Sequence, residues 1–294
     1  MTINPVRPSR CRILPSRSGR LCQTMRRAPP SAWFGMSVLA IYVLVAVLAP
    51  LLAPYGESEV FDESFAPWSA QFVFGTDYLG RDVLSRLIYG ARNTMAIAVA
   101  ATTLSFAVGA LLGIAAALNQ GWFDTVLSRL VDTLMAIPAL IFALMLLAIF
   151  GSSIPNLILI IALIDSTRVF RLTRSVAMDV AVMDFVEIAH LRREGFVWML
   201  RREILPNVTT PLIAEFGMRY CFVFLGIAAL SFLGVGIQPP TADWGSMVRE
   251  NATLIAYGDL TPMLPAAAIA LLTVAINFIV DWLLALSSRL NDAQ

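Results

Sequence analysis

Two pairs of oppositely charged residues stand in otherwise apolar stretches of the sequence. Glu215 and Arg219 are four residues apart, and Asp165 and Arg168 are three residues apart. On a helix these spacings place both side chains on one face, where they can neutralise each other. A charge costs roughly 2.5–3.5 kcal/mol at the centre of a membrane-spanning helix, so charges retained there are by default functional. We expect each pair either to line a pathway for a zwitterionic solute or to form a structural ion pair, for instance at a subunit contact.

The sequence lacks the residues for most catalytic chemistry. All 21 basic residues are arginine, so neither a Schiff-base lysine nor a G-x-x-x-x-G-K-[ST] phosphate loop can form. The cysteines Cys11, Cys22 and Cys221 are far apart, and with the single histidine His190 they offer neither a disulfide framework nor a zinc site. We expect no catalytic residue, no metal site and no enzyme activity, and any ATP in use must be bound by another chain.

The segments that carry the charge pairs are apolar enough to lie in a membrane. Hydrophobic residues make up 58% of the 294 residues and charged residues 14%, against about 45–50% and about 25% in soluble domains. The mean hydropathy is +0.76. These values exclude a soluble globular enzyme and predict an all-α integral membrane protein with six transmembrane helices.

Six spans are predicted: four stretches reach the roughly 20 apolar residues that one crossing needs, and a 32-residue uncharged block is divided into two shorter spans. They are Trp33–Pro54, Asn93–Phe123, the two halves of Thr133–Ile164, Thr209–Gly234 and Pro262–Leu286. The block 133–164 is divided because Gly151–Pro155 is a turn signal in its middle. The first stretch is too long for a typical signal-peptide core and has no small-residue cleavage pattern, so it is interpreted as an uncleaved anchor.

The arginines predict the orientation of these spans. With the N-terminus in the cytoplasm, 16 of the 21 arginines fall in inside segments, 4 fall outside, and Arg219 lies within a span. This bias satisfies the positive-inside rule and places both termini in the cytoplasm. The predicted organisation is a disordered arginine-rich cytoplasmic tail at 1–30, a first span with an outer interfacial segment at 31–92, and a core of five spans at 93–294.

A cytoplasmic loop at 178–207 is polar overall but patterned like helix. Two groups of apolar residues recur at helical spacing on either side of Gly195: Val182, Met183, Val186 and Ala189, then Phe196, Val197, Leu200 and Ile204. Two short amphipathic helices joined at the glycine are predicted. Their apolar faces indicate a partner, either the rest of the chain or another protein. The alternative is a helix that lies in the lipid headgroup layer.

Two further segments are predicted outside the membrane. Between Arg81 and Arg92 the apolar residues lie on one side of a helix, which predicts an interfacial helix with Arg86 and Arg92 free to reach lipid phosphates. Between Gln238 and Trp244 the prolines predict a rigid loop, with Trp244 at the membrane interface. A scaffold role is favoured for this loop over direct solute contact.

Several of these segments resemble one known family. Phe185-Val186-Glu187-Ile188-Ala189, followed by Ile204-Leu205-Pro206-Asn207, resembles the EAA loop of ABC-importer permeases, the cytoplasmic coupling element. The stretches 74–92 (FGTDYLGRDVLSRLIYGAR) and 230–240 (LSFLGVGIQPP), the latter with Asp243-Trp244-Gly245, are similar to the dipeptide, oligopeptide and nickel permeases of the C-subunit type. The similarity covers about Trp33 to Asp281. The family's glycine in the EAA loop is Arg193 here, and because the nearest glycine is Gly195, a shifted turn is expected.

The resemblance implies the architecture of an ABC type I importer permease in the bacterial inner membrane. Such a subunit forms half of a translocation pathway for peptides or similar small solutes. Its implied partners are a homologous B-type permease, two cytoplasmic ATPase subunits that bind ATP and Mg²⁺, and an extracytoplasmic substrate-binding protein. The net charge of +1 gives no indication of a nucleic-acid partner.

The resemblance also implies which residues couple the permease to its ATPases. They are Glu187, Ala189, His190, Arg192, Arg193, Gly195, Ile204 and Pro206. The alternative is an ion-gradient-driven secondary transporter or channel subunit, which six spans and buried charges would fit equally well. Co-purification separates the two, because an importer requires ATPase chains in the complex.

Overall fold

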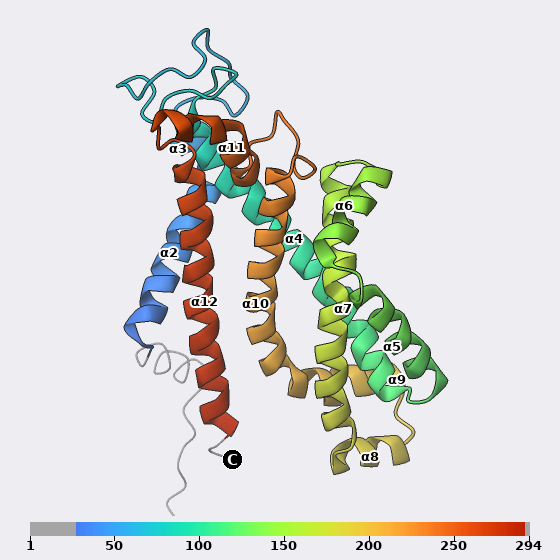
Figure 1. The fold of residues 1–294 in the computed structure, drawn as a ribbon. Coiled ribbons are helices and arrows are strands. Elements are labelled where there is room, and N and C mark those ends of the chain that lie inside the picture. Colours follow the sequence, from blue (N-terminus) through green and yellow to red (C-terminus); the bar gives the residue numbers. More distant parts are fainter. Residues whose placement is uncertain (1–27, 292–294) are drawn as a thin grey trace, which may run out of the picture.

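The computed structural model describes residues 28–291, and every regular element in that range is helical (Figure 1). The predicted tail 1–30 lies outside the described residues except for its last three. The elements are α2 (Pro30–Val47), α3 (Ala49–Leu52), α4 (Val83–Leu118), α5 (Trp122–Met135), α6 (Ala139–Phe150), α7 (Ile154–Ala181), α8 (Asp184–Leu191), α9 (Phe196–Met199), the π-helix η1 (Leu200–Ile204), α10 (Leu205–Phe232), α11 (Trp244–Asn251), the 3₁₀-helix η2 (Ala252–Tyr257) and α12 (Met263–Asn291).

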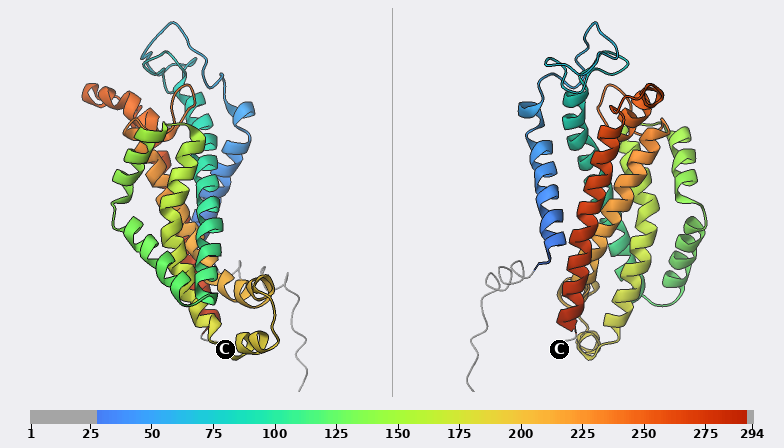
Figure 2. Two further views of the ribbon diagram at one scale, coloured as in Figure 1. Left: turned by 90° about the vertical axis from the view of Figure 1, so that its right-hand side faces the viewer. Right: turned by 60° about the vertical axis from the view of Figure 1, so that its left-hand side comes forward.

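The long helices form an elongated bundle with two distinct ends (Figures 1 and 2). One end, here called the α11 end, carries α3, α11 and the loop 53–82. The opposite α8 end carries α8 and α9. The start of α2 and the end of α12 both point toward the α8 end, so the described chain begins and finishes on the same side of the bundle.

Four helices are long and apolar enough to cross a membrane, and they correspond to predicted spans. They are α2, α4, Pro211–Phe232 of α10 and Met263–Leu286 of α12. A fifth crossing exists if α5 and α6 count as one span bent by 89°. The bend falls just before Pro138, whose ring disfavours helix at the preceding residue, so the first half of the uncharged block is not a straight helix. The helix α7 is 28 residues long but contains Asp165 and Arg168.

The helix α4 starts ten residues before the predicted second span. Asp82 caps it by accepting a hydrogen bond from the Ser85 backbone N–H at 2.7 Å, and the helix then runs unbroken for 36 residues. The predicted interfacial helix is therefore the first part of α4. Its apolar side, including Val83 and Ala91, is buried in the protein, because the segment packs against α2, α3 and α11.

The helices α4 and α7 form the tightest pair in the bundle. Gly109 and Gly113 of α4 are four residues apart, and a Cβ added to them would lie 2.6 Å from the Ser166 carbonyl oxygen and 2.9 Å from the Phe170 carbonyl oxygen. This small-xxx-small spacing lets two membrane helices approach backbone to backbone. The pair anchors the main apolar core, to which α10, α11 and α12 contribute Phe224, Trp244 and Leu272.

Candidate functional site

The four charged residues predicted within the spans lie together in one cluster. Arg219 Nε is 2.7 Å from Glu215 Oε1, and Arg168 Nη1 is 3.8 Å from Asp165 Oδ1. The two pairs are joined because Arg219 Nη1 lies 3.7 Å from the same Asp165 oxygen. The spacing along each helix predicted the pairs, but only the contact of α7 with α10 connects them.

Asp165 is the buried centre of this charge cluster. It is 4% exposed, and Ser105 of α4 donates a hydrogen bond to its Oδ2 at 3.1 Å. Ser105 was not a predicted site residue, since a serine in a long uncharged stretch gives no signal of its partner. Arg219 lies near the middle of α10, about 20 Å from either end at 1.5 Å per residue. The cluster is thus far from both ends of the bundle.

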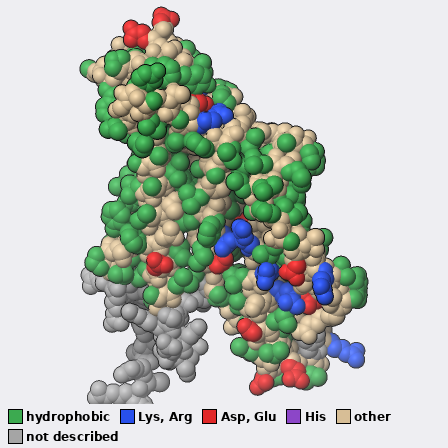
Figure 3. Space-filling view, viewed as in Figure 1, with side chains coloured by type: hydrophobic (Ala, Val, Ile, Leu, Met, Phe, Trp, Pro, Cys, Tyr) green, Lys and Arg blue, Asp and Glu red, His purple; other side chains and the backbone are tan. Residues whose placement is uncertain are grey.

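A cavity of about 180 Å³ opens beside the cluster, between α6, α7 and α10. Asp165 and Arg168 line it together with apolar residues that include Ile161, Phe222, Val223 and Leu230. Arg168 also lines a smaller cavity of about 40 Å³ next to the α5–α6 bend. Figure 3 shows basic and acidic side chains gathered in a recess between α10 and α7, surrounded by hydrophobic surface.

Another ion pair, outside the charge cluster, joins α5 to α7 nearer the α8 end. The Arg174 Nε and Nη2 atoms lie 2.5 Å and 2.6 Å from the two carboxylate oxygens of Asp124. This bidentate geometry is the strong form of an arginine–carboxylate contact. The partners are 50 residues apart, so no local pattern could have paired them. Arg171, on the same helix, is exposed and contacts the sulfur of Met135.

The predicted helical loop is present at the α8 end as α8, α9 and η1. Of the predicted coupling residues, Ala189 and Ile204 are buried. The exposed ones are Glu187, Arg192, Arg193, Gly195 and Pro206. The side chain of His190 lies outside the described part of the structure. The structure gives these residues positions but does not test their role, so their coupling function stays a prediction.

The apolar residues of this loop divide between two surfaces. Val186, Ala189 and Ile204 are buried, and Val186 and Ile204 belong to a cluster with Ile114 of α4 and Val180 of α7. Other parts of this chain, in α4 and α7, therefore cover part of the predicted apolar faces. Other apolar side chains of α8 and its flanks remain exposed: Val182, Met183, Phe185, Ile188 and Leu191.

The turn after α8 is not shifted toward Gly195. Arg193 has the left-handed φ of 56°, and the Glu194 N–H donates to the Ala189 carbonyl oxygen at 3.2 Å. This bond and the left-handed residue make the Schellman arrangement that usually has glycine at this position. The left-handed residue that ends α8 is therefore Arg193, the position that the resemblance assigns to the family's glycine, and not Gly195.

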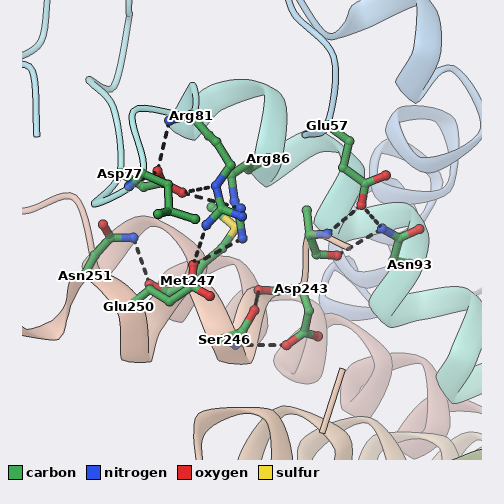
Figure 4. Close-up of polar contacts among 12 residues, drawn as sticks. Glu57, Asp77, Arg81, Arg86, Asn93, Asp243, Ser246, Met247, Glu250 and Asn251 are labelled. Atoms are coloured by element: carbon green, nitrogen blue, oxygen red, sulfur yellow. Dashed lines mark hydrogen bonds and ion pairs between the residues drawn. The ribbon is translucent and has the colours of Figure 1, made fainter. Parts of the chain in front are cut away.

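At the α11 end, four charged side chains form a buried network (Figure 4). Arg81 Nε lies 2.7 Å from Asp77 Oδ2, and Arg81 and Arg86 reach Glu250 Oε2 at 3.1 Å and 3.2 Å. All four side chains are at most 5% exposed. Burial raises the pKa of Glu250, and the two guanidinium groups oppose that rise. Arg86 is therefore not free to reach lipid phosphates, which corrects the sequence prediction, whereas Arg92 is exposed.

Trp244 is also buried rather than placed at a membrane interface. It is 2% exposed, and its indole N–H donates to the Leu87 carbonyl oxygen at 2.9 Å. The preceding Asp243 caps α11 and accepts a hydrogen bond from Thr94 Oγ1 at 2.9 Å. Burial raises the pKa of Asp243, while hydrogen bonds from Ser246 and Thr94 oppose the rise. Asp243 and Trp244 thus fix the start of α11 onto α4, and the scaffold role of the preceding loop stays a prediction.

Glu57 makes a further polar contact at this end. Its Oε1 accepts hydrogen bonds from Asn93 Nδ2 at 2.7 Å and from the Ala242 N–H at 2.5 Å. The loop 53–82, α4 and the start of α11 are therefore joined into one cap (Figure 4). Within residues 28–291, no three His, Cys, Asp or Glu side chains are grouped as metal ligands. The expected absence of a metal site in this chain stays a prediction.

Comparison with known proteins gives consistent matches along the chain. The family described as "Binding-protein-dependent transport system inner membrane component" matches residues 109–291, and "N-terminal TM domain of oligopeptide transport permease C" matches residues 27–73. The di/tripeptide transport system permease protein DppC of Pseudomonas aeruginosa is 36% identical over 267 residues, which is 88% of each chain. The glutathione transport system permease protein GsiD of Escherichia coli is 35% identical over 246 residues, which is 83% of this chain and 81% of GsiD.

These matches define a multi-pass permease of a bacterial ABC importer, located in the inner membrane. Within that class the chain belongs to the family of binding-protein-dependent inner-membrane components, in the C-type branch of its peptide permeases. The resemblance and the location predicted from the sequence are confirmed. The family consists of membrane permease components of ABC transporters, and the expected absence of catalysis by this chain stays a prediction.

Proposed function

We propose that this chain forms half of the translocation pathway of an ATP-driven importer for peptides or similar small solutes. Its relatives are a di/tripeptide and a glutathione permease by name, which supports peptide-like cargo. The other half of the pathway is a homologous B-type permease. Two cytoplasmic ATPase subunits supply the energy, and an extracytoplasmic binding protein delivers the solute.

The proposed subunit has six spans, with the bent α5–α6 pair as the third and α7 as the fourth. At 1.5 Å per residue α7 is about 42 Å long, more than the roughly 30 Å of bilayer hydrocarbon. Its charged residues are accommodated because Asp165 and Arg174 find partners on α10 and α5. The α8 end lies in the cytoplasm, since exposed arginines gather there: Arg192, Arg193, Arg201 and Arg202.

The observation that carries the proposal is the two-sided structure of the loop between α7 and α10. Its inner side is packed into the protein through Val186 and Ile204. Its outer side exposes Glu187 amid apolar side chains such as Ile188 and Leu191. An ATPase bound to the outer side would move α8 and α9, and the packed inner side would transmit that movement to the bundle. Alternating access follows when ATP closes the ATPase pair.

Charge reversal at Glu187 tests this coupling. In the full complex with its binding protein, reconstituted in liposomes, Glu187→Arg should lower ATP-driven peptide uptake by about tenfold or more, the loss expected for one buried charged contact. ATP hydrolysis should continue without stimulation by the loaded binding protein. The matched control is Glu63→Arg, an exposed glutamate at the α11 end. Unchanged coupling in Glu187→Arg would remove Glu187 from the interface.

Isolation of the tagged chain from its own membrane tests the assembly. The proposal requires that a second permease and ATPase subunits co-purify, and that ATP drives uptake. A chain that purifies alone and transports with an ion gradient would overturn it.

A further inference from the structure

The recess between α7 and α10 contains one guanidinium that the chain neutralises only weakly. Arg219 has Glu215 at 2.7 Å. In the described part of the chain, Arg168 has one carboxylate oxygen within 4.0 Å, that of Asp165 at 3.8 Å, and it shares this oxygen with Arg219. The Arg168 side chain is 43% exposed. Arg168 also lines the cavity between α6, α7 and α10.

The depth of Arg168 makes this exposure costly. It lies near the middle of α7, about 20 Å from either end at 1.5 Å per residue. An arginine there cannot extend to the headgroups, and a charge at that depth needs a carboxylate, a polar partner or water. The Asp165 carboxylate is shared, because Arg219 lies beside its Oδ1 and Ser105 donates a hydrogen bond to its Oδ2. These contacts keep it from pairing more closely with Arg168.

The space beside Arg168 has the size and character of one apolar side chain. The cavity of about 180 Å³ lies between α6, α7 and α10, and its walls include Ile161, Leu230 and Phe222. For comparison, an apolar cavity of about 150 Å³ accommodates benzene. The Arg219 guanidinium lies 4.8 Å from the centre of the Phe222 ring. The Arg168 guanidinium thus lies beside an apolar pocket.

We propose that this recess is a transit site for the carboxylate end of a transported peptide-like solute. Arg168 pairs with the carboxylate through its planar fork of N–H donors, the geometry that arginine offers to carboxylates. The adjacent pocket takes the neighbouring side chain. Arg219 and Ser105 act as positioning residues, since they keep Asp165 from neutralising Arg168. The inference rests on the proposed function, because it requires a solute to pass at this depth.

The test uses the reconstituted full complex and two probes, alanyl-phenylalanine and its C-terminal amide. Both are supplied well above their dissociation constants for the binding protein, so that delivery is not limiting. Arg168→Gln should lower uptake of the acid by about tenfold or more, the effect of one charge-assisted hydrogen bond, and should change uptake of the amide less than about twofold. Arg168→Lys should restore part of the uptake of the acid. The matched control Arg171→Gln, three residues along α7 and also exposed, should leave the ratio of acid to amide uptake unchanged.

Three outcomes would overturn the inference while leaving the proposed function standing. Equal loss of acid and amide uptake in Arg168→Gln, with less B-type permease in the complex, would show that Arg168 binds a carboxylate of the partner. Unchanged acid uptake would show that Arg168 does not contact the solute. The same change in ratio from Arg171→Gln would show a general effect of charge. Failure of the wild-type complex to take up either probe with ATP would instead contradict the proposed function for peptides.

Discussion

At the scale of single residues, Arg193 has the least favourable backbone in the loop at the α8 end. A left-handed conformation costs a non-glycine residue roughly 1–2 kcal/mol, and Arg193 has φ 56°. Arg193→Gly should therefore stabilise the purified complex by about 1 kcal/mol, seen as a higher thermal unfolding midpoint. Arg192→Gly is the matched control, because position 192 lacks a positive φ and glycine should destabilise it. A lower midpoint for Arg193→Gly would show that its side chain makes a contact worth more than the strain.

Residue-level prediction worked where partners are close in sequence. The i, i+3 and i, i+4 pairs were found by spacing alone, and both exist. The contacts of Asp165 with Arg219 and of Asp124 with Arg174 depend on which helices are neighbours, and no local pattern contains that information. Arg86 was misjudged for a related reason. An amphipathic segment looks the same in sequence whether protein or lipid covers its apolar side.

At the scale of elements, the close approach of α4 to α7 sets the geometry of the charge cluster. Gly109→Ala places a Cβ 2.6 Å from a backbone oxygen and 2.7 Å from Val169 Cβ, so the helices must separate, at a cost of about 1–3 kcal/mol. We expect a lower unfolding midpoint for the complex. Gly226→Ala on α10 is the matched control, since its Cβ would meet no atom within 4 Å. Alanine favours helix by about 1 kcal/mol, so this control should be neutral or stabilising. Equal unfolding midpoints for Gly109→Ala and Gly226→Ala would contradict the close packing of α4 against α7 at Gly109.

Element boundaries were partly predictable. The four clearly apolar helices were found because each contains an apolar stretch long enough to cross a membrane. The start of α4 was predicted to within two residues, as an interfacial helix beginning at Arg81, and the structure shows that this helix continues unbroken into the second span. The bend between α5 and α6 was missed although Pro138 marks it. Hydropathy alone decided that boundary, and it does not detect kinks.

At the scale of the whole molecule, the proposed six-span topology depends on α7. We expect Ser152→Cys, before α7, to react with a membrane-impermeant maleimide in intact spheroplasts, in a chain whose native cysteines are replaced. Val182→Cys, just after α7 and exposed, should react only after permeabilisation. Asp62→Cys in the loop 53–82 is the control for the outer side. Labelling of Ser152→Cys and Val182→Cys from the same side would exclude α7 as a span.

The two ends of the molecule should respond differently to ionic strength. Salt screens exposed charges over about 8–10 Å at 0.10–0.15 M, and it screens buried pairs much less. The network of Asp77, Arg81, Arg86 and Glu250 is closed to water, whereas the arginines at the α8 end are exposed. If those arginines help to hold the proposed ATPase subunits, concentrated salt should release these subunits and leave the cap at the α11 end folded. A high-salt wash would then distinguish loss of subunit binding from loss of folding in one preparation.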